Sequence, residues 1–329
     1  KSRLISIGSS MVPAIVGTGS NKSDTQMAVF AQVVLGKVKK FALGDLGLHF
    51  ERPIIESGID RWDELDPGAR GGREVEYMGE GETFSLPISA GDLFIPEEVE
   101  RLSEAFGVDC ALPVVANGTA DALLGDDMFV EAKLRQYKGE MIGRKQVYVK
   151  TLPGAGNVYY GDELSREVLP GEYDQNQWNL RATGRSCALH VSQFGMQAGK
   201  TAVFLVPRDD ARIRELEIAV LEFTWKHLSP FWQHGLTTPP ALDESEYSRL
   251  LLNEFMASDK KSIEMTSEMR AKAWQHIKLR AEKKAVDCAF ELHKNQLIGM
   301  LKGSQSASCS DIKVNYRGNR LTVKEIVND

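Results

Sequence analysis

The sequence predicts an α/β fold, with a mixed central β-sheet flanked by helices and a helical C-terminal extension. Short apolar runs bounded by glycine and charged turns occur in the middle of the chain, which is typical of strands. Segments with apolar residues three and four positions apart lie on both sides of them, which is typical of helices. From about residue 236 the composition becomes charged and helical. We therefore divide the chain into a core, residues 1–235, and an extension, residues 236–329, that we expect to pack on the core.

In the first third of the chain, helices are predicted on both sides of a long loop. Residues 26–56 carry apolar side chains at helical spacing and predict one or two helices. Residues 57–82 are rich in glycine and charge and predict a loop. Residues 96–107 predict a short helix, because Pro96 suits its first turn and Gly107 suits its end.

The centre of the chain predicts strands followed by a helix. Residues 110–118, 120–125 and 128–135 are strand-like, and the Gly-Asp-Asp turn at 125–127 predicts that the last two form a hairpin. Residues 172–184 predict a helix that ends at its terminal glycine.

A second hairpin is predicted from residues 187–194 and 201–207. Its connection, GMQAGK, resembles a phosphate-binding loop, but the spacing is one residue short and a strand follows where such a loop needs a helix. We therefore interpret it as a turn. A long helix is predicted at 211–232, a linker at 237–246 and a terminal hairpin at 310–326.

The composition excludes several classes of protein. The formal net charge of −6 does not favour a chain that binds DNA through an overall basic surface, although residues 133–150 hold six Lys or Arg against one Glu. The four cysteines form no CxxC pair and the six histidines show no metal-ligand spacing, so neither a zinc site nor a disulfide framework is indicated. No apolar run reaches the roughly 18 residues of a membrane span. We expect a cytoplasmic protein with no membrane contact.

The stretch 117–139 holds the pattern with the most chemical content. Asp121 lies on one strand of the first hairpin, while Glu131 and Lys133 lie on the next strand and share one face because side chains alternate. The two carboxylates are hard oxygen ligands suited to Mg²⁺ or Mn²⁺, and the peptide carbonyl of Ala132 can supply another oxygen. Lys133 could hold or deprotonate an attacking water. The alternative is an ordinary Glu-Lys ion pair on a solvent-facing strand.

The order Asp, then Glu-x-Lys, on a hairpin resembles the core of the PD-(D/E)xK nucleases. The flanking segments resemble one branch of these enzymes, the phage lambda-type alkaline exonucleases, also called YqaJ-like viral recombinases. The resemblance runs in order over roughly residues 3–228 and is carried by RLISIGSSMVPAIVG, GDLGLHFERPI, the hairpin pattern and YDQNQWNLRATG. The last segment places Gln175, Gln177, Thr183 and Gly184 at the family's positions. Ala120 departs from the family, which usually has a proline there.

The resemblance implies further residues of the catalytic centre. Glu51 corresponds to an additional acidic residue near the metals, and Gln175 corresponds to a glutamine of the catalytic helix. Arg52 stands between Glu51 and Pro53, where the family has none, so Glu56 remains the alternative acid. The plain alternatives are an exposed acid on an amphipathic helix for Glu51 and a polar helix face for Gln175.

The resemblance also implies a pocket for a terminal 5′-phosphate. Arg3 and Ser10 have the family's spacing for its phosphate-contacting arginine and hydroxyl, and Thr119 falls where the family has another hydroxyl. The alternatives are that Arg3 is a frayed terminal residue and that Ser10 only caps the helix that follows.

In function, the resemblance implies a Mg²⁺-dependent exonuclease from a phage or mobile element, acting in the bacterial cytoplasm. Such an enzyme digests one strand of linear double-stranded DNA from the 5′-phosphate end to mononucleotides and leaves a 3′ single strand for recombination. It implies two Mg²⁺ ions per site, with Mn²⁺ as a substitute, a single-strand annealing protein as partner and a ring-shaped homotrimer. Another PD-(D/E)xK endonuclease and a DNA-end-binding scaffold that does not cleave remain open alternatives.

Overall fold

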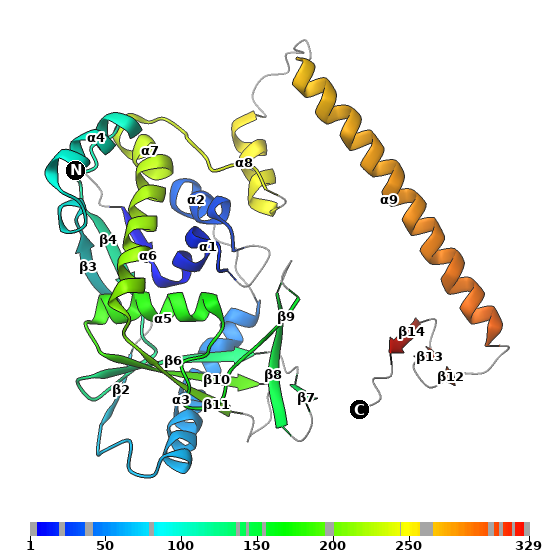
Figure 1. The fold of residues 1–329 in the computed structure, drawn as a ribbon, viewed down its shortest axis with the longest axis horizontal. Coiled ribbons are helices and arrows are strands. Elements are labelled where there is room, and N and C mark those ends of the chain that lie inside the picture. Colours follow the sequence, from blue (N-terminus) through cyan, green and yellow to red (C-terminus); the bar gives the residue numbers. More distant parts are fainter. Residues whose placement is uncertain are drawn as a thin grey trace. The chain divides into compact units, whose positions relative to one another are not determined.

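The computed structural model describes residues 5–19, 24–36, 42–78, 82–135, 139–142, 145–152, 156–194, 201–243, 245–256, 266–301, 306–308, 312–317 and 320–325. The protein is mixed α/β and forms two compact units, Lys1–Ala257 and Ser258–Asp329 (Figure 1). Helix α8 (Glu246–Met256) packs against α2 (Gln26–Leu35) within the first unit. The first compact unit is therefore longer than the predicted core of residues 1–235.

A five-stranded mixed sheet forms the centre of the first unit, in the order β11-β10-β6-β5-β2. The β5/β6 and β10/β11 pairs are antiparallel, as the two predicted hairpins require, and β10 runs parallel to β6. The predicted loop 57–82 is wrong where it includes β2, which pairs with β5 at the sheet edge. The strands are β2 (Val75–Tyr77), β5 (Ala122–Leu124), β6 (Met128–Arg135), β10 (Cys187–Phe194) and β11 (Thr201–Pro207).

A second, three-stranded sheet has the order β1-β4-β3, with β1 (Ser6–Gly8) parallel to β4 (Val114–Gly118) and β3 (Phe84–Ile88) antiparallel to it. Of these three strands, only β4 was predicted from the sequence. Only two residues separate β4 from Asp121, which directly precedes β5. The two sheets are thus linked at the start of the predicted site.

Helix α3 (Ala42–Leu65) covers one face of the central sheet. The predicted end at residue 56 is wrong, because buried apolar side chains continue at helical spacing through Ile59 and Trp62 and hold the helix against the sheet. Gly58 permits this close packing: a Cβ built at that position would lie 2.5 Å from the side chain of Val191.

Helix α5 (Pro170–Thr183) covers the opposite face of the sheet (Figure 1). It ends at Gly184, which adopts the left-handed conformation at φ +71°, as the sequence predicts. Its buried side includes the polar side chains of Glu172, Asn176 and Asn179. Buried polar groups need hydrogen-bonding partners, and the sheet supplies them.

The remaining helices of the first unit pack around a core that contains Trp178 and Trp225. The short helix predicted at 96–107 is confirmed as α4 (Pro96–Phe106). The long helix predicted at 211–232 is confirmed as α6 (Asp210–Phe223), a π-helical turn (Thr224–Leu228) and α7 (Ser229–His234) in succession. The other elements are α1 (Val12–Val16), the 3₁₀ turns η1 (Ser9–Met11) and η2 (Ala90–Asp92), and a sheet of β7 (Gly139–Ile142), β8 (Lys145–Leu152) and β9 (Gly156–Tyr159).

The second unit contains a long helix, α9 (Ser267–Met300), and a small antiparallel sheet. The predicted terminal hairpin is confirmed as β13 (Ile312–Arg317) and β14 (Arg320–Glu325), with β12 (Ser306–Ser308) added beside β13. Within the described residues, no helix combines the length and apolar character needed to cross a membrane.

Candidate active site

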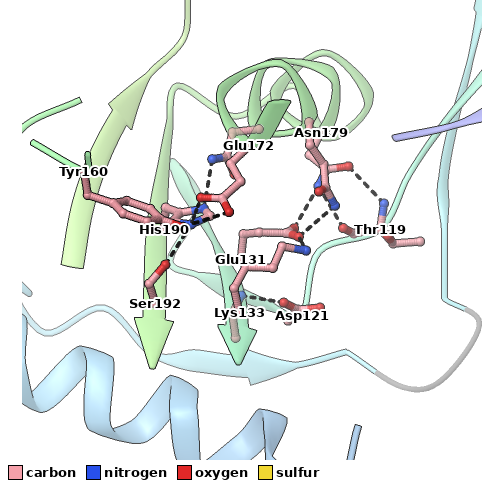
Figure 2. A network of polar contacts seen from close by, with 12 residues as sticks. Thr119, Asp121, Glu131, Lys133, Tyr160, Glu172, Asn179, His190 and Ser192 are labelled. Carbon is pink, nitrogen blue, oxygen red and sulfur yellow. Dashed lines mark hydrogen bonds and ion pairs between the residues drawn. The ribbon is translucent and has the colours of Figure 1, made fainter. Parts of the chain in front are cut away.

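The β5/β6 hairpin brings together the three residues that the sequence singled out. The backbone N–H of Asp121 donates to the carbonyl of Val130 over 3.1 Å, which places Asp121 beside β6. Glu131 and Lys133 project from β6, and their side chains contact one another, with the Lys133 ammonium on Oε1 of Glu131 (Figure 2). The predicted shared face is therefore present.

The carboxylate of Asp121 points toward the edge of β6. Its Oδ2 accepts a hydrogen bond from the backbone N–H of Ala132 at 2.6 Å. Because the N–H and C=O of one strand residue leave the strand on the same side, the carbonyl of Ala132 also faces the Asp121 side of β6. This direction suits the peptide oxygen that the sequence analysis assigned to the metal site.

The environment of Asp121 disfavours its ionised form. Burial, the nearby carboxylate of Glu131 and, to a smaller degree, that of Glu51 raise the pKa of Asp121 to about 8. The Lys133 ammonium and the Ala132 N–H oppose this rise without cancelling it. Burial and neighbouring like charges both favour the protonated acid, and a group shifted in this way is typical of functional sites.

Glu131 is one of the few acidic side chains in the core, with 2% of its surface exposed. Oε1 accepts a hydrogen bond from Nε2 of Gln175 at 2.8 Å and also contacts the ammonium of Lys133. Oε2 accepts a hydrogen bond from Nδ2 of Asn179 at 3.0 Å. A buried carboxylate is stable only with such partners, and here they fix its orientation.

Asn179 is not among the site residues predicted from the sequence. It lies four residues after Gln175, so both side chains project from the same side of α5 toward Glu131. That spacing, read together with the burial of the helix, is the signal that could have identified it. Gln177 lies on a different side, where it bonds the Pro207 carbonyl and the Asp209 N–H and so anchors α5 structurally.

The structure places Glu51 and Glu56 in different environments. Glu51 on α3 is close enough to Asp121 to contribute to its raised pKa. Glu56 instead bonds Arg52 at 3.0 Å and accepts a hydrogen bond from the Tyr77 hydroxyl at 3.2 Å, on the exposed side of α3. Of the two alternatives, Glu51 is the one near the hairpin carboxylates.

The predicted phosphate-binding residues are only partly described. Ser10 and Thr119 are exposed and follow the ends of the parallel strands β1 and β4, in which Gly8 pairs with Asn117. Both therefore lie at the same edge of the second sheet. Arg3 lies outside the described residues.

A second buried polar network lies beside Glu131 on the same face of the sheet. His190 on β10 is the register partner of Glu131 on β6. Its Nε2 lies 3.2 Å from Glu172, which also accepts a 2.9 Å hydrogen bond from the Tyr160 hydroxyl, and its Nδ1 lies 3.1 Å from the amide of Asn176 (Figure 2). These contacts attach the first half of α5 to the sheet.

The donor set fits a divalent cation chemically. Asp121 lies near the carboxylates of Glu131 and Glu51 and near the Lys133 ammonium, and repulsion by the two carboxylates contributes to the raised pKa of Asp121, which a bound cation would relieve. Within the described residues, no three Asp, Glu, His or Cys side chains already converge as a ligand shell.

Solved structures give matches at low identity. The chain is similar to the alkaline exonuclease LHK-Exo of Laribacter hongkongensis, with 17% identity and a TM-score of 0.35 over 67% of this chain and 87% of that chain. LHK-Exo in complex with dAMP matches with 14% identity and a TM-score of 0.36, over 77% and 94% of the two chains. A protein of Eubacterium rectale, described as an exonuclease by assignment only, matches with 10% identity and a TM-score of 0.38, over 81% and 92% of the two chains. The sequence matches no protein-family profile and no curated protein.

Proposed function

We propose that this protein is a metal-dependent deoxyribonuclease of the PD-(D/E)xK type that digests linear double-stranded DNA from the 5′ end. The observation that carries the proposal is the grouping of Asp121, Glu131 and Lys133 on one hairpin, with Glu51 and Gln175 reaching the same carboxylates from helices on opposite faces of the sheet. An ordinary solvent-facing ion pair would not require a buried Glu131 with three separate partners.

In this proposal Asp121, Glu131, Glu51 and the Ala132 carbonyl hold Mg²⁺, for which Mn²⁺ can substitute. Two such ions, when bound, would stabilise the charge that develops on the entering and leaving oxygens of the phosphodiester. The residues of the chain have separate tasks. Lys133 holds the attacking water and can take its proton. Gln175 donates a hydrogen bond to the Glu131 carboxylate and so fixes its orientation.

Direction would be set by a pocket for the terminal phosphate. Ser10 and Thr119 are exposed hydroxyls at one sheet edge, and Thr119 is only two residues from Asp121. A hydroxyl pair near the carboxylates can hold a phosphate at a fixed distance from the scissile bond, and Arg3 would add a charge-assisted fork. Replacing Arg3 with Ala should then remove any preference for 5′-phosphorylated over 5′-hydroxyl ends.

A single digestion tests the proposed activity. Linear duplex DNA labelled separately at its 5′ and 3′ ends is incubated with the protein in Mg²⁺ or in EDTA, beside a covalently closed circular plasmid. We expect Mg²⁺-dependent release of mononucleotides from the 5′ end and an intact circle. Cleavage of the circle would identify an endonuclease. An absence of acid-soluble product, with binding to DNA ends retained, would identify a scaffold that does not cut.

The assembly and the partner follow from the same proposal. A closed ring of three identical chains would keep the enzyme on its DNA despite its net charge of −6. Light scattering should give three times the chain mass of 36.5 kDa, and a monomer under active, low-salt conditions would contradict the ring. The 3′ single strand left by the reaction is the substrate of a single-strand annealing protein, which we propose as the partner.

A further inference from the structure

Asn179 makes several hydrogen bonds within the site, although no sequence motif marks it. We propose that Asn179 is a positioning residue that sets the separation of the two metal-binding carboxylates, Asp121 and Glu131. This inference rests on the proposed metal site and goes beyond it, because Asn179 is not expected to touch either the metal or the DNA.

The amide of Asn179 joins two segments that each carry one carboxylate. Its Oδ1 accepts a hydrogen bond from the backbone N–H of Thr119 at 3.1 Å, and its Nδ2 donates to the backbone carbonyl of the same residue at 2.9 Å. The same Nδ2 donates to Oε2 of Glu131 at 3.0 Å. Figure 2 shows this side chain between Thr119 and Glu131. One side chain thus fixes Glu131 and the backbone two residues before Asp121.

The loop that carries Asp121 is held at both ends by these contacts. At Thr119 both backbone groups bond to Asn179, and at Asp121 the backbone N–H bonds to Val130 on β6. Only Ala120 stands between the two attachment points. The backbone position of Asp121 relative to Glu131 is therefore determined from both sides, which limits how far the carboxylates can separate.

Few other side chains could replace this amide. Asn179 is fully buried, and a Cβ built on neighbouring Gly118 would lie 3.0 Å from its Oδ1, so the space is tight. Aspartate has the same shape but would lack both donors and would face Glu131 with a second negative charge. Alanine would leave Oε2 of the buried Glu131 without the amide that donates to it, and a buried unpaired group is costly.

This arrangement leaves Glu131 able to bind a metal ion. A carboxylate oxygen has two lone pairs, so Oε2 can accept from Asn179 and still donate its other pair to a cation. Residues that hydrogen-bond to a metal ligand without touching the metal typically contribute about 10–100-fold to metal affinity. Loss of Asn179 should therefore weaken Mg²⁺ binding through geometry, without removing a ligand.

Two variants with matched burial test this role. Asn179→Ala removes the positioning amide, while Asn176→Ala removes another fully buried amide of α5, which contacts His190 and not the site. Calorimetric titration with Mg²⁺ should show affinity about 10–100-fold weaker in Asn179→Ala and close to wild type in Asn176→Ala. Hydrogen exchange in the metal-free protein should be faster at the Thr119 amide only in Asn179→Ala.

The outcomes separate this inference from the proposed function. Wild-type Mg²⁺ affinity in Asn179→Ala would overturn the positioning role alone and leave the metal site in place. An equal loss of affinity in Asn176→Ala would show that both changes act by loosening α5, and would also overturn the role. A wild-type protein that binds no Mg²⁺ would overturn the metal site and this inference together.

Discussion

The backbone N–H of Ala132 donates to Oδ2 of Asp121 over 2.6 Å, just before β5 begins and where β6 continues past it. Without a metal, this hydrogen bond and the Lys133 ammonium are what favours the charged form of Asp121, against burial and two neighbouring carboxylates. The hydrogen bond fixes the position of the carboxylate, and the raised pKa means that it binds a proton more tightly than an ordinary aspartate does. That property has a measurable consequence for stability.

We predict that the metal-free protein loses stability as the pH rises through the range in which Asp121 ionises. The pKa of Asp121 is raised from 3.8 to about 8 in the folded protein. Between these values the folded state keeps a proton that the unfolded chain has released, so the free energy of unfolding falls with increasing pH. Urea titrations in EDTA should show this fall, and Asp121→Asn, which cannot ionise, should reduce it. An identical pH dependence in wild type and variant would contradict the raised pKa.

Lys133 should matter for cleavage more than for metal binding. Its ammonium contacts Glu131, and in the proposed reaction it holds or deprotonates the water. Lys133→Ala should reduce the rate by more than about tenfold, since proton transfer by a positioned group typically contributes about 10²–10⁴-fold. Mg²⁺ affinity should be unchanged or higher, because Glu131 loses a competing cation.

The pH profile of cleavage checks the same role. If Lys133 has to be neutral to accept a proton, the wild-type rate should rise above neutral pH. A flat profile across the alkaline range, or a variant that keeps more than about a tenth of the wild-type rate, would remove Lys133 from the reaction.

Gly118 should be intolerant of a side chain, although no positive φ requires glycine there. A Cβ at this position would lie 2.6 Å from Cβ of Ala182 and 3.0 Å from Oδ1 of Asn179, so α5 would have to move away from β4. Overpacking of this kind typically costs about 1–3 kcal/mol. Gly118→Ala should lower the free energy of unfolding by about this amount, and Mg²⁺ affinity should fall with it.

Gly8 provides the matched control, because a Cβ built there meets nothing within 4 Å. Gly8→Ala should leave both the free energy of unfolding and Mg²⁺ affinity near wild-type values. Equal stability of the two alanine variants would mean that α5 can shift without cost.

The hairpin could be predicted from the sequence because its pattern is local. Alternation along β6 puts Glu131 and Lys133 on one face whatever the rest of the fold does, and the Gly-Asp-Asp turn sets the pairing. The strands β1 and β3 were not predicted, because the runs are short and their partner, β4, lies far away in the sequence. Pairing between distant segments leaves little trace in a short stretch of sequence.

Asn179 and the choice between Glu51 and Glu56 depend on how helices dock, which spacing alone does not determine. The buried side of α5 carries polar residues, so the apolar stripe that usually marks a buried helix face is absent there. The partners of those residues on β6 and β10 become visible only when the helix is in place. In α3, the docking of Ile55, Ile59 and Trp62 on the sheet decides which glutamate lies near Asp121.

Glu51 and Glu56 offer a comparison within one helix. Both lie on α3, five residues apart, and both were candidates for the extra acidic residue of the site. Glu51 contributes to the raised pKa of Asp121, whereas Glu56 is held in an exposed cluster with Arg52 and Tyr77, in which the guanidinium also lies 4.6 Å from the ring centre. Exposed ion pairs of this kind contribute little to stability, because water screens the attraction.

We therefore predict that Glu51→Gln weakens Mg²⁺ binding and slows cleavage by at least about tenfold, as expected for the loss of a carboxylate from the metal site. The same change should lower the pKa of Asp121, because one of the like charges that raise it is gone. Glu56→Gln should leave cleavage, Mg²⁺ affinity and the titration of Asp121 at wild-type values. NMR titration of the Asp121 carboxyl carbon in the metal-free variants measures this effect independently of activity. If Glu56→Gln were the variant that loses Mg²⁺ binding, α3 would have to turn in the functional enzyme to bring its exposed side to the hairpin.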